Sequence, residues 1–388
     1  MSDPRFAAPD GFLDAASGQP MRPAGRDALL AALDAGWADP ARLYRDARRA
    51  RALLDAARES VAARIGARPD EVSFTASGTE AIHRGVEGLL RGRIRAGRRL
   101  VVSAVEHSAV LRAADVHAAA GGEVATVGVD RLGRVDADAF VDACGEGTAA
   151  ACLQQANHEV GTTQPVAEVG GLLGERGVPL LVDAGQAVGR VPVAAGWSAL
   201  TASARLWGGP PGVGVLAVRT GVRWRADGTA DEREGGRVPG FAPVPLIVAA
   251  AAALEDVDRD RDAESARLSA LVDRLRSAVP AAIDDVDLLG DPVHRLPHLV
   301  TFSVLYADGE SLVLALDREG LAVTSGSACV SDTRRPSHVL AAMGALTQGN
   351  LRVSLPHGCP VETVDRLIHV LPRVVAEVRA SIDPGGVP

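Results

Sequence analysis

The sequence predicts an α/β protein built on a mostly parallel β-sheet, and two patterns carry this prediction. Up to about residue 220, short and continuously apolar runs alternate with helix-like stretches, which is typical of strands buried on both faces and joined by helices. A long helical stretch and a smaller α+β unit follow. We expect a large domain over residues 16–255 and a small domain formed by residues 1–15 and 256–388.

Seven strands and five helices are expected in the large domain. Asp39 and Pro40 have the residue types of an N-cap and a first helical position, and Gly66 is a typical helix end, so a helix is predicted between them. Ser77 and Glu80 have the spacing of a capping box before a helix that reaches about Leu90. The other helices are expected at Ser108–Ala120, Asp136–Cys144 and Val166–Arg176. The strands are expected at Val72–Phe74, Leu100–Ala104, Glu123–Val127, Ala150–Gln154, Pro179–Asp183, Leu200–Ser203 and Gly212–Val218.

The remaining elements frame the small domain. A strand-like segment is expected at Phe12–Ala16, a polar surface excursion at Gly221–Pro239 and a long helix at Val244–Val279. Two strands, near His298–Val304 and Asn350–Leu355, and three helices complete the unit. These helices are expected near Gly309–Arg318, Ser337–Met343 and Val361–Ile382.

Composition narrows the possible functions. The net charge is −8, and all 41 basic residues are arginine, spread along the chain rather than gathered in one block, so neither a nucleic-acid footprint nor a polybasic membrane patch is expected. The longest apolar run, Pro245–Leu254, is about half a membrane span. With no signal-peptide pattern at the N-terminus, a cytoplasmic location is expected. The four cysteines have no CxxC spacing, and no disulfide framework is expected.

Several residues at the ends of the predicted strands could carry chemistry. The turn Ser77-Gly78-Thr79-Glu80 could bind a phosphate at a helix N-terminus, although an ordinary capping box explains it equally well. Asp183 ends a buried strand, where α/β sheets bind ligands; it could hold a pyridinium nitrogen protonated or cap a helix. His107 could stack on a flat ring, carry a proton or cap the helix that follows.

Two further segments suit an amino-acid substrate. Residues 324–329 are a run of small residues that ends in Cys329, and a thiol on such a loop is more reactive than a buried one. Arg352 lies among strand residues, where its guanidinium fork suits an α-carboxylate or, alternatively, an ion pair with a nearby acid.

Together these residues resemble the cysteine desulfurases, members of the class-V aminotransferase family with the fold-type I pyridoxal phosphate architecture and its seven-stranded sheet. The resemblance runs in order along nearly the whole chain. Its most specific part is Thr324–Cys329 followed by Pro336-Ser337-His338-Val339-Leu340, which is similar to the catalytic-cysteine loop of the long-loop group. The other matching segments are Leu13–Ala16, Ser77–Glu80, Glu106-His107, Asn157–Gly161, Asp183–Gln186 and Arg352.

The resemblance implies pyridoxal 5′-phosphate as cofactor and L-cysteine as substrate. Cys329 would take the substrate sulfur as a persulfide, Arg352 would bind the α-carboxylate beside Asn157, and His107 would stack on the cofactor ring and take part in catalysis. Asp183 would pair with the ring nitrogen. The other implied cofactor contacts are Gly78, Thr79, His158, Gln186, Ser203 and Arg205. A sulfur-acceptor protein and a homodimer with shared active sites are implied as partners, and no metal is expected.

The sequence departs from the family at the cofactor. The family's Schiff-base lysine lies in the loop Ser203–Gly212 and reads Leu206 here; the residue before it reads Arg205 instead of histidine. A second asparagine beside the cofactor ring reads His158, and a threonine that reaches the partner subunit's phosphate reads Phe241. Leucine can neither form an imine nor move a proton, and arginine cannot substitute because it stays protonated.

Three hypotheses remain open. In the first, the chain is a desulfurase-like enzyme that holds pyridoxal phosphate non-covalently, with Arg205 on the phosphate and His107 or His158 carrying the proton. In the second, it is a catalytically inactive homologue that serves as a sulfur relay or an iron–sulfur assembly scaffold. In the third, the pocket has been reassigned to another amino acid or to a phosphorylated metabolite.

Overall fold

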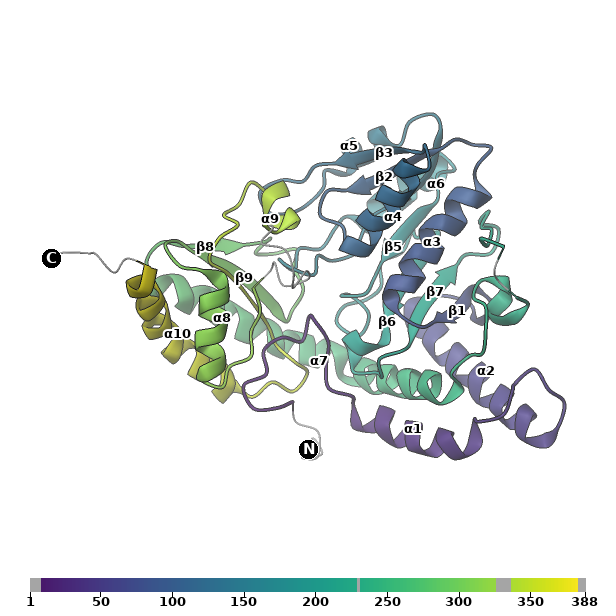
Figure 1. Cartoon of the computed structure of the whole chain (residues 1–388), viewed down its shortest axis with the longest axis horizontal. Helices are drawn as coiled ribbons and strands as arrows, with labels where there is room; N and C mark the ends of the chain where they lie inside the picture. The colour runs from purple at the N-terminus through teal and green to yellow at the C-terminus, as the bar shows by residue number, and fades with distance from the viewer. Residues whose placement is uncertain (1–7, 229–230, 326–335, 383–388) are drawn as a thin grey trace.

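Two β-sheets organise the chain, as the computed structural model shows (Figure 1). The structure describes residues 8–228, 231–325 and 336–382. The larger sheet has seven strands in the order β1-β7-β6-β5-β4-β2-β3, and the smaller has three in the order β10-β9-β8. This is the α/β architecture that the sequence predicts.

The larger sheet is parallel except at one edge, where β7 runs antiparallel to both β6 and β1. Each predicted strand is present, with ends within two residues of the prediction. The strands are β1 Val72–Thr75, β2 Arg99–Ser103, β3 Glu123–Val127, β4 Thr148–Cys152, β5 Leu180–Asp183, β6 Ala199–Ser203 and β7 Gly214–Val218. Six of them are buried along their whole length or all but one residue, which accounts for their continuous apolar runs.

Helices cover both faces of this sheet, because alternate strand residues point to opposite sides. Val101 and Val182 pack in a core with α2 (Arg45–Ile65), α5 (Ala137–Ala143), α6 (Val166–Glu175) and the start of α7 (Val244–Ala282). Val102 and Leu181 pack in a separate core with α3 (Gly78–Gly92) and α4 (Ser108–Ala119). Short 3-10 helices lie at η2 Pro69–Glu71, η3 Ala204–Trp207 and η4 Arg233–Gly236.

The smaller sheet is antiparallel and has its own core. It contains β8 Val286–Leu289, β9 Leu299–Val304 and β10 Asn350–Ser354, with helices α8 Gly309–Arg318, α9 His338–Ala342 and α10 Val361–Ile382. Leu13 is buried in this core, and the predicted N-terminal strand is reduced to isolated bridges from Phe12 and Asp14. The domain boundaries at residues 15 and 255 stay a prediction, because α7 runs without a break through residue 255.

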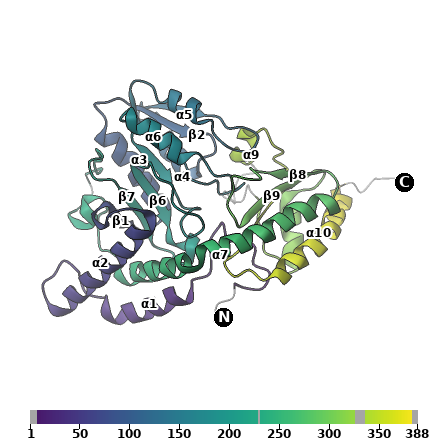
Figure 2. The same ribbon diagram turned by 180° about the vertical axis from the view of Figure 1, so that it is seen from behind.

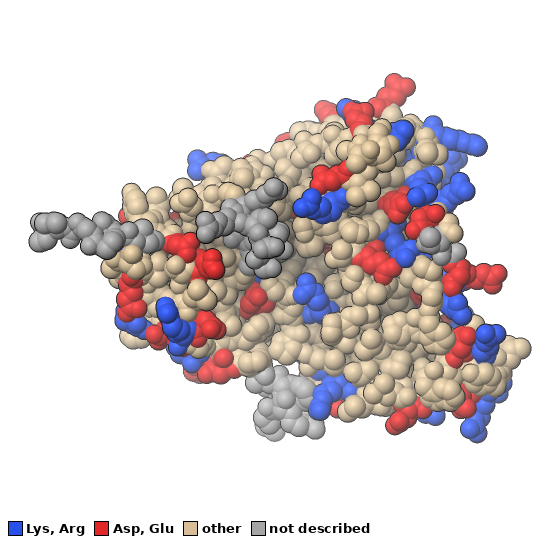
Figure 3. All heavy atoms as spheres, in the orientation of Figure 1, with Lys and Arg blue, Asp and Glu red and all other residues tan. Residues whose placement is uncertain are grey.

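Helix α7 joins the two cores (Figure 2). Its first part, through Leu254, packs under the large sheet, and its later part, from Leu268 to Val279, packs in the core of the small sheet. Among the described residues, no helix is long and apolar enough to span a membrane. Acidic and basic side chains are interspersed on the face drawn in Figure 3.

Three expectations about elements were wrong. The helix predicted from Asp39-Pro40 begins only at Arg45, because the Asp39 carboxylate accepts a hydrogen bond from the Ala41 N–H within a turn. Helix α1 (Pro23–Ala35) was not expected; two of its leucines, Leu30 and Leu33, are more than half exposed, so its apolar pattern is weak. Strand β8 was also missed, since it is only four residues long and contains an aspartate.

Candidate active site

The predicted site residues gather where the carboxyl ends of the large sheet face the small sheet. His107 follows β2, His158 follows β4, Asp183 ends β5, and Arg205 follows β6. From the small sheet, the Arg352 guanidinium in β10 donates to the His158 carbonyl oxygen at 2.9 Å. Residues far apart in the sequence therefore meet at one edge, the position where open α/β sheets bind ligands.

Asp183 caps a tight turn rather than a helix. Its Oδ1 accepts a hydrogen bond from the Gly185 N–H at 2.9 Å. Burial raises the pKa of the Asp183 carboxyl, and the nearby His107 opposes that rise. The side chain is thus held at the strand end with the His107 ring as its neighbour, and this position suits a carboxylate that pairs with a pyridinium nitrogen.

Three histidines lie in series beside Asp183. The ring centroids of His107 and His158 are 5.1 Å apart at an interplanar angle of 70°, and those of His158 and His338 are 6.4 Å apart. His107 also caps α4, because its Nδ1 accepts from the Ala109 N–H at 3.1 Å. Burial lowers the pKa of His107, and it lowers the pKa of His158 well below its usual value. The His158 ring is therefore neutral near pH 7.

Two buried glutamates complete the acid–base cluster. Glu106 accepts from the Gln154 N–H at 2.8 Å, and burial raises its pKa to about 8. Glu159 lies 3.7 Å from the Nε2 of His158 and accepts from the Ser337 hydroxyl at 2.5 Å; burial raises its pKa to about 7. Both carboxyls were missed from the sequence, because their burial depends on contacts with distant parts of the chain.

The turn before α3 forms a narrow cradle against the end of β6. Ser77 caps the helix by accepting from the Glu80 N–H at 3.0 Å, as its spacing predicts. A Cβ added at Gly78 would lie only 2.8 Å from the Cβ of Ser203, so only glycine permits this approach. Thr79 is exposed in the first turn. A phosphate at this helix N-terminus would meet free N–H groups and the hydroxyls of Thr79 and Ser203.

Leu206 lies against the Asp183 turn. A Cβ added at Gly185 would lie 3.3 Å from the Cδ1 of Leu206 and 3.1 Å from the Oδ1 of Asp183. Trp207, directly after it, is 1% exposed and donates from Nε1 to the Ala250 carbonyl of α7 at 3.0 Å. The loop is therefore firmly packed, and the side chain at position 206 is apolar where the family's lysine would be.

The N-terminal segment 14–19 binds three of the predicted site residues. Gln186 donates to the Ala16 carbonyl at 2.8 Å, Arg205 donates to the Ser17 carbonyl, and Arg352 donates to the Asp14 carboxylate at 2.8 Å and the Ser17 hydroxyl at 2.6 Å. Arg352 thus forms the ion pair weighed as an alternative, yet its buried Nε has no hydrogen-bond partner within the described structure. The sequence offered the Leu13–Ala16 match as a signal, but no site role was predicted for Asp14 or Ser17.

The remaining substrate residues are placed differently. Asn157 is fully buried: its amide nitrogen donates to the Val105 carbonyl at 3.0 Å, and its oxygen accepts from the Glu159 and Val160 N–H groups at 2.8 Å. These contacts organise the turn that carries His158, and a substrate role for Asn157 stays a prediction. Cys329 lies outside the described residues.

Both ends of the segment that contains Cys329 are fixed at the site. Before it, Thr324 pairs with Arg352 through backbone hydrogen bonds of 2.7 and 3.3 Å. After it, Ser337 contacts Glu159, and His338 Nε2 donates to the Glu106 carbonyl oxygen at 2.9 Å. Cys144, Cys152 and Cys359 are buried thiols, as expected, and the residues described include no group of three or more side chains suited to hold a metal ion.

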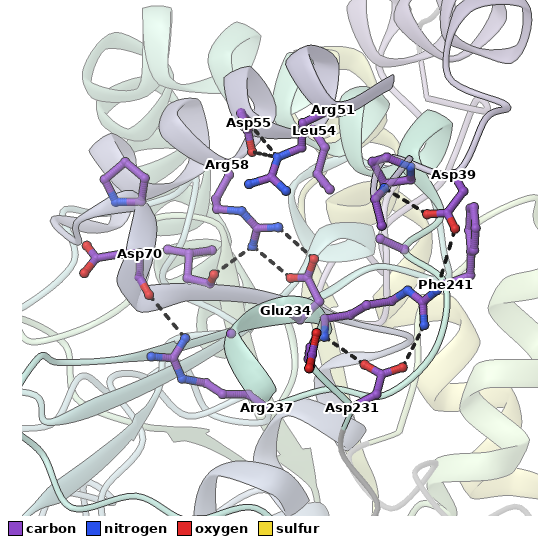
Figure 4. A pocket seen from close by; sticks show the side chains of 18 of the residues that line it. Asp39, Arg51, Leu54, Asp55, Arg58, Asp70, Asp231, Glu234, Arg237 and Phe241 are labelled. Atoms are coloured by element: carbon purple, nitrogen blue, oxygen red, sulfur yellow. Dashed lines mark hydrogen bonds and ion pairs between the residues drawn. The ribbon is translucent and has the colours of Figure 1, made fainter. Parts of the chain in front are cut away.

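A pocket of about 840 Å³ lies elsewhere, between α2 and the segment 231–242 (Figure 4). Arg58 pairs with Glu234 at 2.7 Å, and Arg233 pairs with Asp231 at 2.9 Å. Many of the charged side chains that line this pocket are therefore neutralised in ion pairs. Phe241, in place of the family's threonine, also lines it and is 55% exposed.

The non-covalent part of the site fits pyridoxal phosphate. Asp183 is positioned for a ring nitrogen, His107 lies beside it, and the turn at Gly78 approaches Ser203 closely only because Gly78 has no side chain. The covalent part does not fit, since Leu206 has no amine. The residues present are therefore compatible with a cofactor that is bound without a protein–cofactor bond.

Comparisons with known proteins agree with this architecture. The class-V aminotransferase model matches residues 38–367. A cysteine desulfurase IscS from Dictyoglomus turgidum is 33% identical over 379 residues, with 96% of each chain covered. An IscS-like cysteine desulfurase from Mycobacterium tuberculosis is 38% identical over 388 residues, which covers 95% of this chain and 97% of the relative.

Solved structures extend the likeness to three dimensions. A NifS-like protein superposes with a TM-score of 0.87 at 25% identity, covering 94% of this chain and 99% of that one. DndA from Streptomyces lividans superposes with a TM-score of 0.76 at 29% identity, covering 86% and 96%. Enzymes of this family depend on pyridoxal 5′-phosphate. With its seven-stranded sheet and these relatives, the chain belongs to the class-V aminotransferase family, within the group of the cysteine desulfurases.

Proposed function

We propose that this chain mobilises sulfur from L-cysteine as a persulfide on Cys329, with pyridoxal phosphate held non-covalently because the lysine position is Leu206. The observation that carries the proposal is Arg352. Its guanidinium is buried at the site and is held by Asp14, Ser17 and the His158 carbonyl, and its Nε has no hydrogen-bond partner among the described residues. A substrate carboxylate would satisfy that N–H, and the guanidinium fork suits a carboxylate.

The cofactor would be held by contacts that do not need lysine. Asp183 would pair with the ring nitrogen, His107 would lie against the ring, and Gln186 would bind the phenolic oxygen in place of the Ala16 carbonyl. The phosphate would be bound by the α3 N-terminus and by Ser203, Thr79 and Arg205. When bound, the cofactor supplies an electron sink for bonds at the substrate's α-carbon.

A histidine would replace the lysine as proton carrier. His158 suits this role because its burial keeps the ring neutral, its Nδ1 has no partner among the described atoms, and its Nε2 lies 3.7 Å from the Glu159 carboxyl. Glu159, with a pKa of about 7, can supply or receive a proton near neutral pH. His107, at 5.1 Å between ring centroids, would extend this path toward Asp183.

Cys329 would carry out the sulfur step. Its thiolate attacks the substrate sulfur, the new S–S bond forms, and the substrate's C–S bond breaks. The bonding electron pair stays on the substrate carbon, which is then protonated, so that alanine leaves and the persulfide remains for an acceptor protein. The fixed ends of the segment, at Thr324 and Ser337, support a loop that begins and ends beside Arg352 and Glu159.

Turnover by the reconstituted protein tests the proposal. Alanine and sulfide are measured from cysteine with pyridoxal phosphate, against the same cofactor without protein, and the Cys329 persulfide is detected by mass spectrometry. Cys329→Ser should lower the rate at least about 1,000-fold. Cys359→Ala should retain it, because that thiol is buried and burial raises its pKa to about 11. A rate no higher than free cofactor, with no persulfide, contradicts the proposal.

One observation favours a second function. Segment 14–19 already occupies Gln186, Arg205 and Arg352, which suits an inactive homologue that relays sulfur or serves as an iron–sulfur assembly scaffold. In that case Cys329 would receive a persulfide from a competent desulfurase while the chain alone stays inactive. Unchanged transfer in Cys329→Ser excludes this function.

We also propose a homodimer and a cytoplasmic location. Three bulky apolar side chains support the dimer, since Trp37, Leu43 and Phe241 are 64%, 86% and 55% exposed. Two of the three are aromatic, and aromatic side chains are enriched at protein–protein interfaces.

A further inference from the structure

A preformed apolar groove lies between α3 and α4, on the outer side of the large sheet. Its volume is about 470 Å³. Val86, Leu90 and Ile94 contribute from α3 and its end, and Val116 contributes from α4. Ile94 and Val116 come from different segments but line the same groove. Their side chains are 65% and 71% exposed, which is unusual for large apolar residues.

The walls of the groove are fixed at one end by reciprocal contacts. The His117 ring Nε2 donates to the Arg98 carbonyl at 2.7 Å, and the Arg98 guanidinium donates to the Ala120 carbonyl at 2.7 Å. At the other end, the groove is lined by His83, in the second turn of α3 after Gly78. The groove therefore runs from its hydrogen-bonded end toward the N-terminus of α3, which lies at the candidate active site.

The rim is basic although the whole chain carries a net charge of −8. The charged lining residues are three arginines and one glutamate, Arg91, Arg98, Arg112 and Glu87. The chain is also locally rich in arginine here, at Arg91, Arg93, Arg95, Arg98 and Arg99. Arg91 pairs with Glu87, and Arg112 pairs weakly with Asp115 at 3.4 Å, both side chains being well exposed. An acidic occupant would be attracted to this rim.

The apolar residues suit a helix. Leu90 and Ile94 are four residues apart at the C-terminal end of α3, and Val116 of α4 lines the same groove, whereas Val86 is 1% exposed. An amphipathic helix places its apolar side chains at the matching spacing and binds in such grooves. We propose that the α3–α4 groove is the docking site for an acidic amphipathic helix of a partner protein. This inference does not depend on turnover at the active site.

Binding of a synthetic helix tests the proposal. The probe is a fluorescein-labelled peptide of about 18 residues, long enough to form a helix, with leucines at i, i+3, i+4 and i+7 and glutamates on the opposite face. A scrambled peptide of the same composition is the control. Fluorescence anisotropy should show saturable binding of the first peptide to the full-length protein, at least about tenfold tighter than the scramble and weaker at high salt.

Variants locate the binding site. Ile94→Glu and Val116→Glu, each added to an exposed position, should weaken binding at least about tenfold, and Arg112→Glu should reduce its salt dependence. Leu314→Glu on α8, at a side chain that is 56% exposed, is the matched control and should bind as the unchanged protein does. Circular dichroism confirms that each variant is folded.

Three outcomes would overturn the proposal. They are no saturable binding, equal binding of the scrambled peptide, and binding unaffected by Ile94→Glu and Val116→Glu. Tight binding of a single-stranded oligonucleotide that Arg112→Glu weakens and Ile94→Glu does not would also overturn it, because it would assign the rim to nucleic acid.

Discussion

The two walls of the candidate site differ in what they retain. The wall formed by the large sheet carries Leu206 beside the Asp183 turn, and a leucine has no amine that could tether a cofactor. The wall formed by the small sheet keeps Arg352, buried and held by three groups, and the segment with Cys329 begins and ends nearby. The contrast separates two tasks of the site, namely holding the cofactor and binding the substrate.

Restoring the lysine should produce the largest change. Leu206→Lys places an amine beside Asp183, so the variant should form a covalent, borohydride-reducible link with pyridoxal phosphate where the unchanged protein forms none. Intact-mass spectrometry after reduction measures it. Leu314→Lys, at an exposed position on α8, controls for random surface modification. Equal labelling of both variants would show that position 206 does not face the cofactor.

Glu106 should control the pH dependence of stability on the large-sheet wall. Its pKa is raised to about 8 by burial, so its contribution is fully present below about pH 4.5 and is lost as pH rises through about 8, by up to about 5 kcal/mol. Glu106→Gln should remove this loss, because the amide oxygen can still accept from the Gln154 N–H. Urea unfolding of both proteins between pH 5 and 9 gives the difference.

The exposed Glu310→Gln is the control for that measurement. At each pH, the unfolding free energy of each variant is subtracted from that of the unchanged protein. The difference isolates the contribution of Glu106 from that of the buried histidines, which titrate at lower pH because burial lowers their pKa. A Glu106→Gln difference that stays flat across this pH range would mean that the carboxyl is solvated rather than buried.

Arg352 should dominate stability on the opposite wall, with a somewhat smaller effect. Arg352→Gln leaves the Asp14 carboxylate without its cationic partner and should cost about 3 kcal/mol of unfolding free energy. Asp14→Asn in the same chain should recover part of this loss. The exposed Arg373→Gln should change stability by less than about 1 kcal/mol. Equal losses in Arg352→Gln and Arg373→Gln would show that the ion pair is solvated.

Sequence patterns were most informative where the local environment is uniform. Six of the seven strands of the large sheet are almost completely buried, so their apolar runs located them. The spacing of Ser77 and Glu80 located the start of α3. Asp39-Pro40 misled because a turn and a helix start use the same residue types at that point. Helix α1 was not predicted, because Leu30 and Leu33 remain exposed and its apolar pattern is therefore weak.

The site was predicted in part, for a related reason. Motifs identified the residues that follow strand ends, such as His107 and Asp183, because the sheet brings those ends together. The contact between Arg205 and Ser17 joins positions 188 residues apart, and no local pattern reports it. The same holds for the raised pKa of Glu106 and Glu159, which depends on burial by several distant elements.

Helix α7 has a consequence for how the molecule unfolds. Its 39 residues form a strut of about 58 Å whose two ends belong to different cores. If one core unfolds, the half of α7 that packs in it loses its contacts, and this destabilises the half that packs in the other core. The two parts should therefore share one cooperative transition, and a mutation deep in the small sheet should lower the melting temperature reported by a probe in the large one.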